Sequence, residues 1–264
     1  MLAGFWSGPF TRSGKSALVP RGPWHYALSG LAVHYKADSE LLKDVVPKPL
    51  EVDNGEVFAY LVDVVSWSPN AAEVNIEAPD MVQYGEAAFF LKVKHDGNTY
   101  AYCPYMWVDN DVALLRGLLA GWPKKLAKLA LTRLHPMLPA FNRPKKGMKL
   151  GGYAMRYGYG LYSIRVELEE ENPSKKLPLL GEYPFILPRY FADIAPTLGG
   201  INELVEFVGE ADIEAWEGKG SISIGGGFND ELDAFKPVGE VKGYYFNMLL
   251  KAKSLRSVVK MEGF

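Results

Sequence analysis

Residues 87–108 read AAFFLKVKHDGNTYAYCPYMWV, and this stretch decides the fold. Two runs rich in β-branched and aromatic residues, Ala87 to Val93 and Thr99 to Val108, flank the turn sequence His95-Asp96-Gly97-Asn98. Asp-Gly between two such runs is a strong hairpin signal, because both central residues of a tight hairpin turn adopt positive φ. The stretch therefore predicts two neighbouring antiparallel strands.

Other parts of the chain extend this pattern. Further strands are expected at Val57 to Trp67, Gly152 to Glu169 and Glu240 to Leu250. The expected helices are a short one through Val45 capped by Asp38 or Ser39, one at Val112 to Ala120 capped by Asp109 or Asn110, and short ones at Asn202 to Val208 and Lys251 to Val259. The last of these segments could equally continue a strand. The residues thus predict an α+β protein rich in sheet.

Length and composition place the chain among globular proteins. The 264 residues are 48% hydrophobic, enough for a substantial core, and we expect one domain over residues 1–264. Residues 1–18 are expected to form an amino-terminal arm, and residues 136–149 a loop excursion.

Several classes of function are disfavoured. The 29 basic and 31 acidic residues give a net charge of −2, so a nucleic-acid partner is not expected. The single Cys103 can form neither an internal disulfide nor a cysteine zinc site, which favours a cytoplasmic protein. Apolar runs fall short of the roughly 20 residues that cross a membrane, so no membrane association is expected. No metal or cofactor motif stands out, so neither a metal nor a cofactor is predicted.

The pair Lys124-Lys125 lies in an unusual context, directly after Trp122-Pro123 and between two apolar segments. Proline disfavours helix in the residue before it, so the chain is expected to be extended there. Consecutive side chains of an extended chain point to opposite faces, so one of the two lysines can face inward. Such an amine attacks a carbonyl only after losing its proton, and both burial and a nearby cation disfavour the ammonium form.

At these residues the sequence resembles the acetoacetate decarboxylase family. The similarity covers roughly residues 19 to 250, and the matching motifs occur in the family's order: Pro20-Arg21-Gly22-Pro23, 45–53, Tyr84-Gly85-Glu86-Ala87, Val108-Asp109-Asn110, Trp122-Pro123-Lys124-Lys125-Leu126, Leu187-Pro188-Arg189-Tyr190 and Glu214-Ala215-Trp216. The resemblance implies an α+β fold with a large antiparallel, barrel-like β-sheet and a few short helices. It also implies a homo-oligomer that acts on a small keto acid.

The same resemblance assigns the site residues. Lys124 is implied to be the Schiff-base lysine, Glu86 the active-site glutamate and Lys125 the neighbour that tunes the reactivity of the amine. The residues implied to contact substrate are Met106, Trp107 and Tyr60.

Three departures from the family pattern bear on the substrate. The stretch from Trp24 to Ser29 holds no arginine where the family has one near the substrate carboxylate, and Tyr60 stands where a second glutamate is expected. Arg116-Gly117-Leu118 replaces the family's glycine-arginine-glutamate. Three hypotheses remain open: decarboxylation of a small β-keto acid through an imine on Lys124, an aldolase-dehydratase acting on pyruvate and an aldehyde, and a ligand-binding protein without catalysis.

Overall fold

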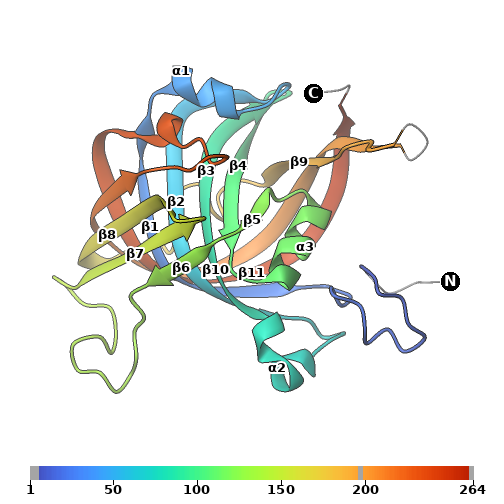
Figure 1. Ribbon diagram of the computed structural model, residues 1–264. Coiled ribbons are helices and arrows are strands. Elements are labelled where there is room, and N and C mark those ends of the chain that lie inside the picture. The colour runs from blue at the N-terminus through green and yellow to red at the C-terminus, as the bar shows by residue number, and fades with distance from the viewer. Residues whose placement is uncertain (1–5, 196–198, 262–264) are drawn as a thin grey trace.

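The computed structural model describes residues 6–195 and 199–261 (Figure 1). Its strands are β1 (His25–Ala37), β2 (Glu51–Trp67), β3 (Gln83–His95), β4 (Asn98–Val108), β5 (Lys124–Leu126), β6 (Lys128–Leu131), β7 (Lys149–Arg156), β8 (Tyr159–Glu171), β9 (Phe185–Phe191), β10 (Ile201–Ile224) and β11 (Pro237–Lys260). The helices are α1 (Ser39–Leu42), α2 (Val74–Glu77) and α3 (Asp111–Ala120), with 3₁₀ turns η1 (Lys43–Val45), η2 (Pro79–Met81) and η3 (Asp233–Phe235). No helix in these described ranges is long and apolar enough to cross a membrane.

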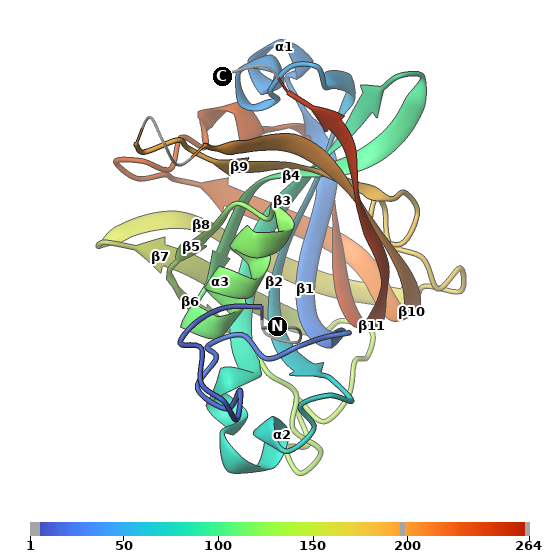
Figure 2. The ribbon, with the colours of Figure 1, turned by 90° about the vertical axis from the view of Figure 1, so that its right-hand side faces the viewer.

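The strands form one large sheet that closes on itself. Its order is β11-β1-β2-β3-β4-β9-β10-β8-β7-β6, and β10 also pairs with β11. This extra pairing joins the ends of the seven-strand path from β11 to β10 into a ring, which is visible in Figure 2. The pairs are antiparallel except for β4 with β5 and β4 with β9, which are parallel. The α+β, barrel-like sheet with few short helices is therefore confirmed.

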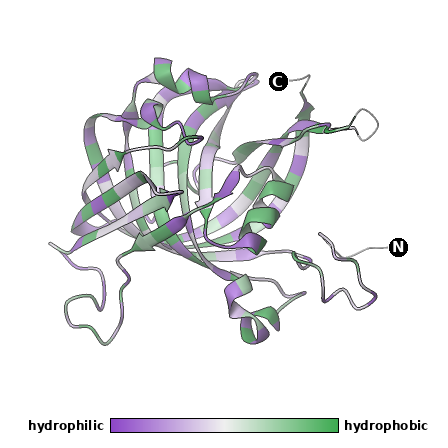
Figure 3. Ribbon diagram, viewed as in Figure 1, coloured by the Kyte–Doolittle hydropathy of each residue, from purple (hydrophilic) through white to green (hydrophobic). Residues whose placement is uncertain are grey.

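Two hydrophobic cores lie on the two faces of the central strands. One fills the ring and includes Phe58, Phe90 and Phe246. The other lies between the outer face of the ring and the layer of β6, β7 and β8, and includes Phe89 and Ile164. Because both faces of β2 and β3 are covered, these strands are apolar along most of their length rather than alternating. More exposed strands alternate hydrophobic and hydrophilic residues (Figure 3).

Local signals were read correctly at the hairpin and at the main helix. β3 and β4 pair antiparallel, and Asp96 and Gly97 have φ of 47° and 75°, as a tight hairpin turn requires. Helix α3 begins after Asn110, whose side chain accepts from the backbone N–H of Ala113 at 2.7 Å. It ends at Gly121, where φ is 96°.

Two expectations were wrong. Residues 202–208 are not a helix but part of β10, because they pair with β9 on one side and β11 on the other, and this pairing overrides local helical propensity. The single strand expected at Gly152 to Glu169 is two strands, because Tyr157 and Gly158 both take positive φ and reverse the chain. The ambiguous segment 251–259 continues β11 as a strand.

Candidate active site

The ring encloses a cavity of about 510 Å³. Strands β4 and β9 pair only at Ala101 and Tyr102, and farther along β4 pairs instead with β5. Helix α3 contributes Arg116, Gly117 and Leu119 to the cavity wall. The helix and the strand that follows it therefore bring Lys124 to the cavity.

Strand β5 sends its two lysines to opposite sides of the sheet. Lys124 pairs with Met106 and Lys125 with Trp107, in parallel register along β4. Met106 faces the cavity, whereas Trp107 packs in the core outside the ring. Lys124 accordingly lines the cavity and Lys125 does not. This is the alternation expected from the extended chain after Pro123.

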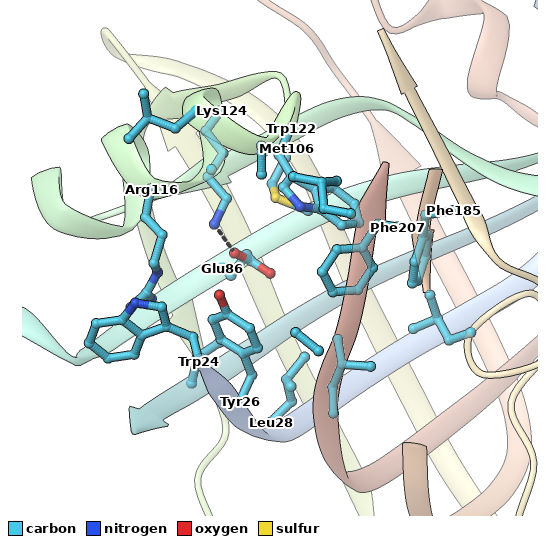
Figure 4. Close-up of a pocket in the computed structure, with 18 of the residues that line it drawn as sticks. Trp24, Tyr26, Leu28, Glu86, Met106, Arg116, Trp122, Lys124, Phe185 and Phe207 are labelled. Atoms are coloured by element: carbon cyan, nitrogen blue, oxygen red, sulfur yellow. Dashed lines mark hydrogen bonds and ion pairs between the residues drawn. The ribbon is translucent and has the colours of Figure 1, made fainter. Parts of the chain in front are cut away.

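The amine of Lys124 is buried beside a carboxylate. Its Nζ donates to Oε2 of Glu86 at 2.7 Å, and the two side chains are only 7% and 8% exposed. Figure 4 shows the pair meeting inside the cavity, Lys124 from β5 and Glu86 from β3. The Nζ also lies 5.4 Å from the ring centroid of Tyr84. Because the carboxylate and the amine are within hydrogen-bond distance, Glu86 can accept a proton directly from Lys124.

Tyr60 fixes the other oxygen of this carboxylate. Its hydroxyl donates to Oε1 of Glu86 at 2.6 Å. Burial, together with the charge of Glu86, raises the pKa of Tyr60 well above its ordinary value, so the hydroxyl remains a donor at neutral pH. Burial likewise raises the pKa of Tyr84. Glu86 is thus held between an amine and a phenol.

Arg116 lines the cavity, although the sequence reasoning did not assign it to the site. The residue is 3% exposed, and its guanidinium carbon lies 4.4 Å from the ring centroid of Trp24 and 5.1 Å from that of Tyr26. Nη2 donates to the hydroxyls of Ser66 and Tyr84, whereas Nη1 is buried without a hydrogen-bond partner.

No carboxylate pairs with Arg116 anywhere in residues 6–195 and 199–261. Arg116 is thus a buried cation in the cavity lining without a carboxylate partner, and such a cation favours an anion beside it. The signal in the sequence was the lone charge within the apolar segment Val112 to Ala120.

Lys125 is held in a separate buried cluster. Its Nζ donates to the backbone oxygen of Asn229 and to Oδ1 of Asp230 at 2.9 Å. Asp230 is 2% exposed and also accepts from Nε1 of Trp107 at 3.0 Å and from Arg156 at 3.3 Å. The structure thus brings Lys124, Glu86, Met106 and Tyr60 together around the cavity and places Lys125 and Trp107 on the other face of the sheet.

Gly117 gives Lys124 its path into the cavity. A Cβ built at Gly117 would lie 2.3 Å from Cδ and 2.5 Å from Cε of Lys124. The aliphatic part of the lysine therefore rests directly on the backbone of α3, in space that any other residue would fill.

Comparison with known proteins identifies the family and several relatives. A family model described as acetoacetate decarboxylase matches residues 7–261. An acetoacetate decarboxylase of Burkholderia cenocepacia is 23% identical over 218 residues, which are 79% of this chain and 77% of the relative. The acetoacetate decarboxylase of Clostridium beijerinckii is 29% identical over 109 residues, 40% of each protein. The matched stretch thus spans about two fifths of that relative's length.

Solved structures share the fold. An acetoacetate decarboxylase-like enzyme from Sphingomonas wittichii RW1 superimposes with a TM-score of 0.87, at 23% identity, over 97% of this chain and 100% of that one. The enduracididine biosynthesis enzyme MppR, complexed with the condensation product of pyruvate and imidazole 4-carboxaldehyde, gives a TM-score of 0.84 at 24% identity, over 96% and 95%.

Proposed function

The chain belongs to the acetoacetate decarboxylase family, and from this premise we propose that it is a lyase that forms an imine between Lys124 and the ketone of a small keto acid. The observation that carries the proposal is the buried contact between Lys124 and Glu86, inside a cavity that is also lined by Arg116, which has no carboxylate partner among the described residues. Together these residues supply a nucleophile, a proton acceptor and an anion site.

The specific reaction proposed is decarboxylation of a β-keto acid. Glu86 accepts a proton from Lys124, and the free amine attacks the ketone carbon; loss of water then gives a protonated imine. The bond between the α-carbon and the carboxylate breaks, its electron pair moves into the imine to form an enamine, and CO₂ leaves. Protonation of the enamine carbon and hydrolysis of the imine release the ketone and restore Lys124. The electron sink is the imine, so no step requires another cofactor.

Each cavity residue has a role in this scheme. Arg116 turns its guanidinium toward the substrate carboxylate and so replaces the arginine that is absent between Trp24 and Ser29. Tyr60 orients Glu86, which carries the proton from the amine and returns it to the enamine. Met106 lies beside Lys124 across the strand pair and excludes water from the imine.

One observation favours the second candidate, an aldol condensation and dehydration that retains the carboxylate. A carboxylate bound by a buried guanidinium is stabilised as the anion, which opposes its departure as neutral CO₂. In this alternative the enamine of pyruvate attacks an aldehyde, and water is lost from the resulting alcohol.

The test is chemical trapping. The protein is incubated with acetoacetate or with pyruvate and reduced with borohydride, and the adduct is mapped by mass spectrometry. We expect a secondary amine at Lys124, absent from Lys124→Arg because a guanidinium stays protonated. Release of CO₂ from acetoacetate supports decarboxylation, whereas consumption of an aldehyde with pyruvate supports the alternative. A folded protein that forms no adduct with either acid would refute both enzyme reactions and favour a ligand-binding protein.

A further inference from the structure

The cavity is far larger than a small keto acid. Its volume of about 510 Å³ lies within the roughly 300–1,000 Å³ of pockets that enclose drug-sized ligands. Acetoacetate fills only a minor part of such a space, and the remainder must be occupied by another part of the substrate or by water.

The groups proposed to act on the substrate, Arg116, Lys124 and Glu86, lie at one side of this space (Figure 4). On the other side of the amine the wall is mainly apolar, although β9 and β11 also contribute Arg189, Lys253 and Ser254 to the lining. We call this second region the apolar arm; its residues are Leu28, Phe185, Phe207, Met248, Leu250 and Ala252. They come from β1, β9, β10 and β11, so the arm extends across the ring from the lysine strand.

Aromatic rings cluster where the apolar arm meets the strand that bears Lys124. Trp122, two residues before Lys124, meets Phe185 edge to face at 5.1 Å and Phe207 at 5.8 Å. Phe185 and Phe207 are themselves 5.9 Å apart. Phe90 follows Glu86 on the same face of β3 and lies 5.8 Å from Phe185. These rings already contact one another, and a further aromatic ring can pack against the side of the cluster that lines the cavity.

The cations that border this region are already paired. Arg189 donates to Glu203 at 2.8 Å and to the backbone oxygen of Leu119, and Lys253 pairs with Glu210 at 2.8 Å. Neither therefore offers an open charge to a polar tail, in contrast to Arg116, and a polar group in the apolar arm would lose its hydration without compensation.

We infer that the substrate is a keto acid with a phenyl-sized apolar tail. Its carboxylate binds Arg116, its ketone reaches Lys124 and its tail fills the apolar arm. The inference rests on the proposed imine chemistry and adds the class of substrate. Burial of a benzyl group, the side chain of phenylalanine, strengthens binding roughly 30-fold.

The test compares acetoacetate with 3-oxo-5-phenylpentanoate in borohydride trapping at Lys124. We expect the phenyl acid to half-saturate trapping at a concentration roughly 30-fold lower. Ala252→Trp, which fills the apolar arm, should remove most of this ratio. Leu249→Trp on the same strand is the matched control, since Leu249 points out of the ring and is 37% exposed, and should keep the ratio. Thermal melts confirm that both variants fold.

A second readout separates this inference from the proposed function. Binding of 5-phenylpentanoate, which lacks the ketone, is measured by isothermal titration calorimetry in Lys124→Arg and in its Ala252→Trp double variant. Binding that Ala252→Trp weakens at least tenfold supports the apolar arm even if no imine forms, in which case only the catalytic proposal fails. Equal half-saturation for the two keto acids, or binding of 5-phenylpentanoate unaffected by Ala252→Trp, would overturn the inference.

Discussion

Replacing Gly117 with alanine tests whether the path of Lys124 across α3 sets its reactivity. The new Cβ would lie 2.3 Å from Cδ of Lys124, whereas ordinary contact begins at 3.4 Å, so the lysine chain must move by about 1 Å. That displacement pulls Nζ from its 2.7 Å contact with Glu86. A misplacement of about 1 Å costs roughly 100-fold in rate. The helix itself should gain up to about 1 kcal/mol, because alanine favours helix over glycine.

The assay is the rate of borohydride-trapped adduct formation with acetoacetate, measured beside a thermal melt. Gly117→Ala should lower the rate about 100-fold while Tm stays level or rises, a combination that unfolding cannot produce. Gly160→Ala is the matched control, because nothing lies within 4 Å of a Cβ at Gly160. If Gly117→Ala forms the adduct at the wild-type rate, the seating of Lys124 on α3 has no chemical role.

Three further predictions address charge and pH. Arg116→Met should raise the half-saturating concentration of acetoacetate about 100-fold. Adduct formation with acetone, which has no carboxylate, should stay nearly unchanged. An equal loss with both ketones would contradict an anion site. Lys125→Met should lower stability by about 1–3 kcal/mol in urea unfolding, because the buried Asp230 loses a charged hydrogen-bond partner. The pH onset of trapping should stay in place, and an onset at higher pH would instead support tuning by Lys125. Burial raises the pKa of Tyr35 above its ordinary value. The contribution of Tyr35 to stability is therefore complete below the pKa of the unfolded chain, near 10, and is lost as the pH rises toward the pKa of the folded protein. Tyr35→Phe should flatten the fall in urea midpoint above pH 10, and an unchanged slope would refute this.

Sequence reasoning was reliable where neighbouring residues decide the structure. The turn at Asp96 and Gly97 and the cap at Asn110 depend on a few adjacent residues, and both were predicted. The opposite facing of Lys124 and Lys125 followed from the geometry of an extended chain after proline, and the structure places them so.

Sequence reasoning was unreliable where segments distant in the chain decide the structure. The strand at 202–208 is fixed by β9 and β11, neither of which its own residues reveal. The role of Arg116 depends on Trp24 and Tyr26, about 90 positions away, which shield the guanidinium without neutralising it. From the sequence alone, Arg116 was only a departure from a family motif.

The three-residue strand β5 limits which insertions and deletions the chain tolerates. Its alternation assigns Lys124 to the cavity and Lys125 to Asp230, and a shift of register by one residue would exchange the two faces. Inserting or deleting one residue between Gly121 and Lys124 would thus present the wrong amine to the ketone, although every residue type was kept. The length of this connection is therefore constrained independently of its residue types.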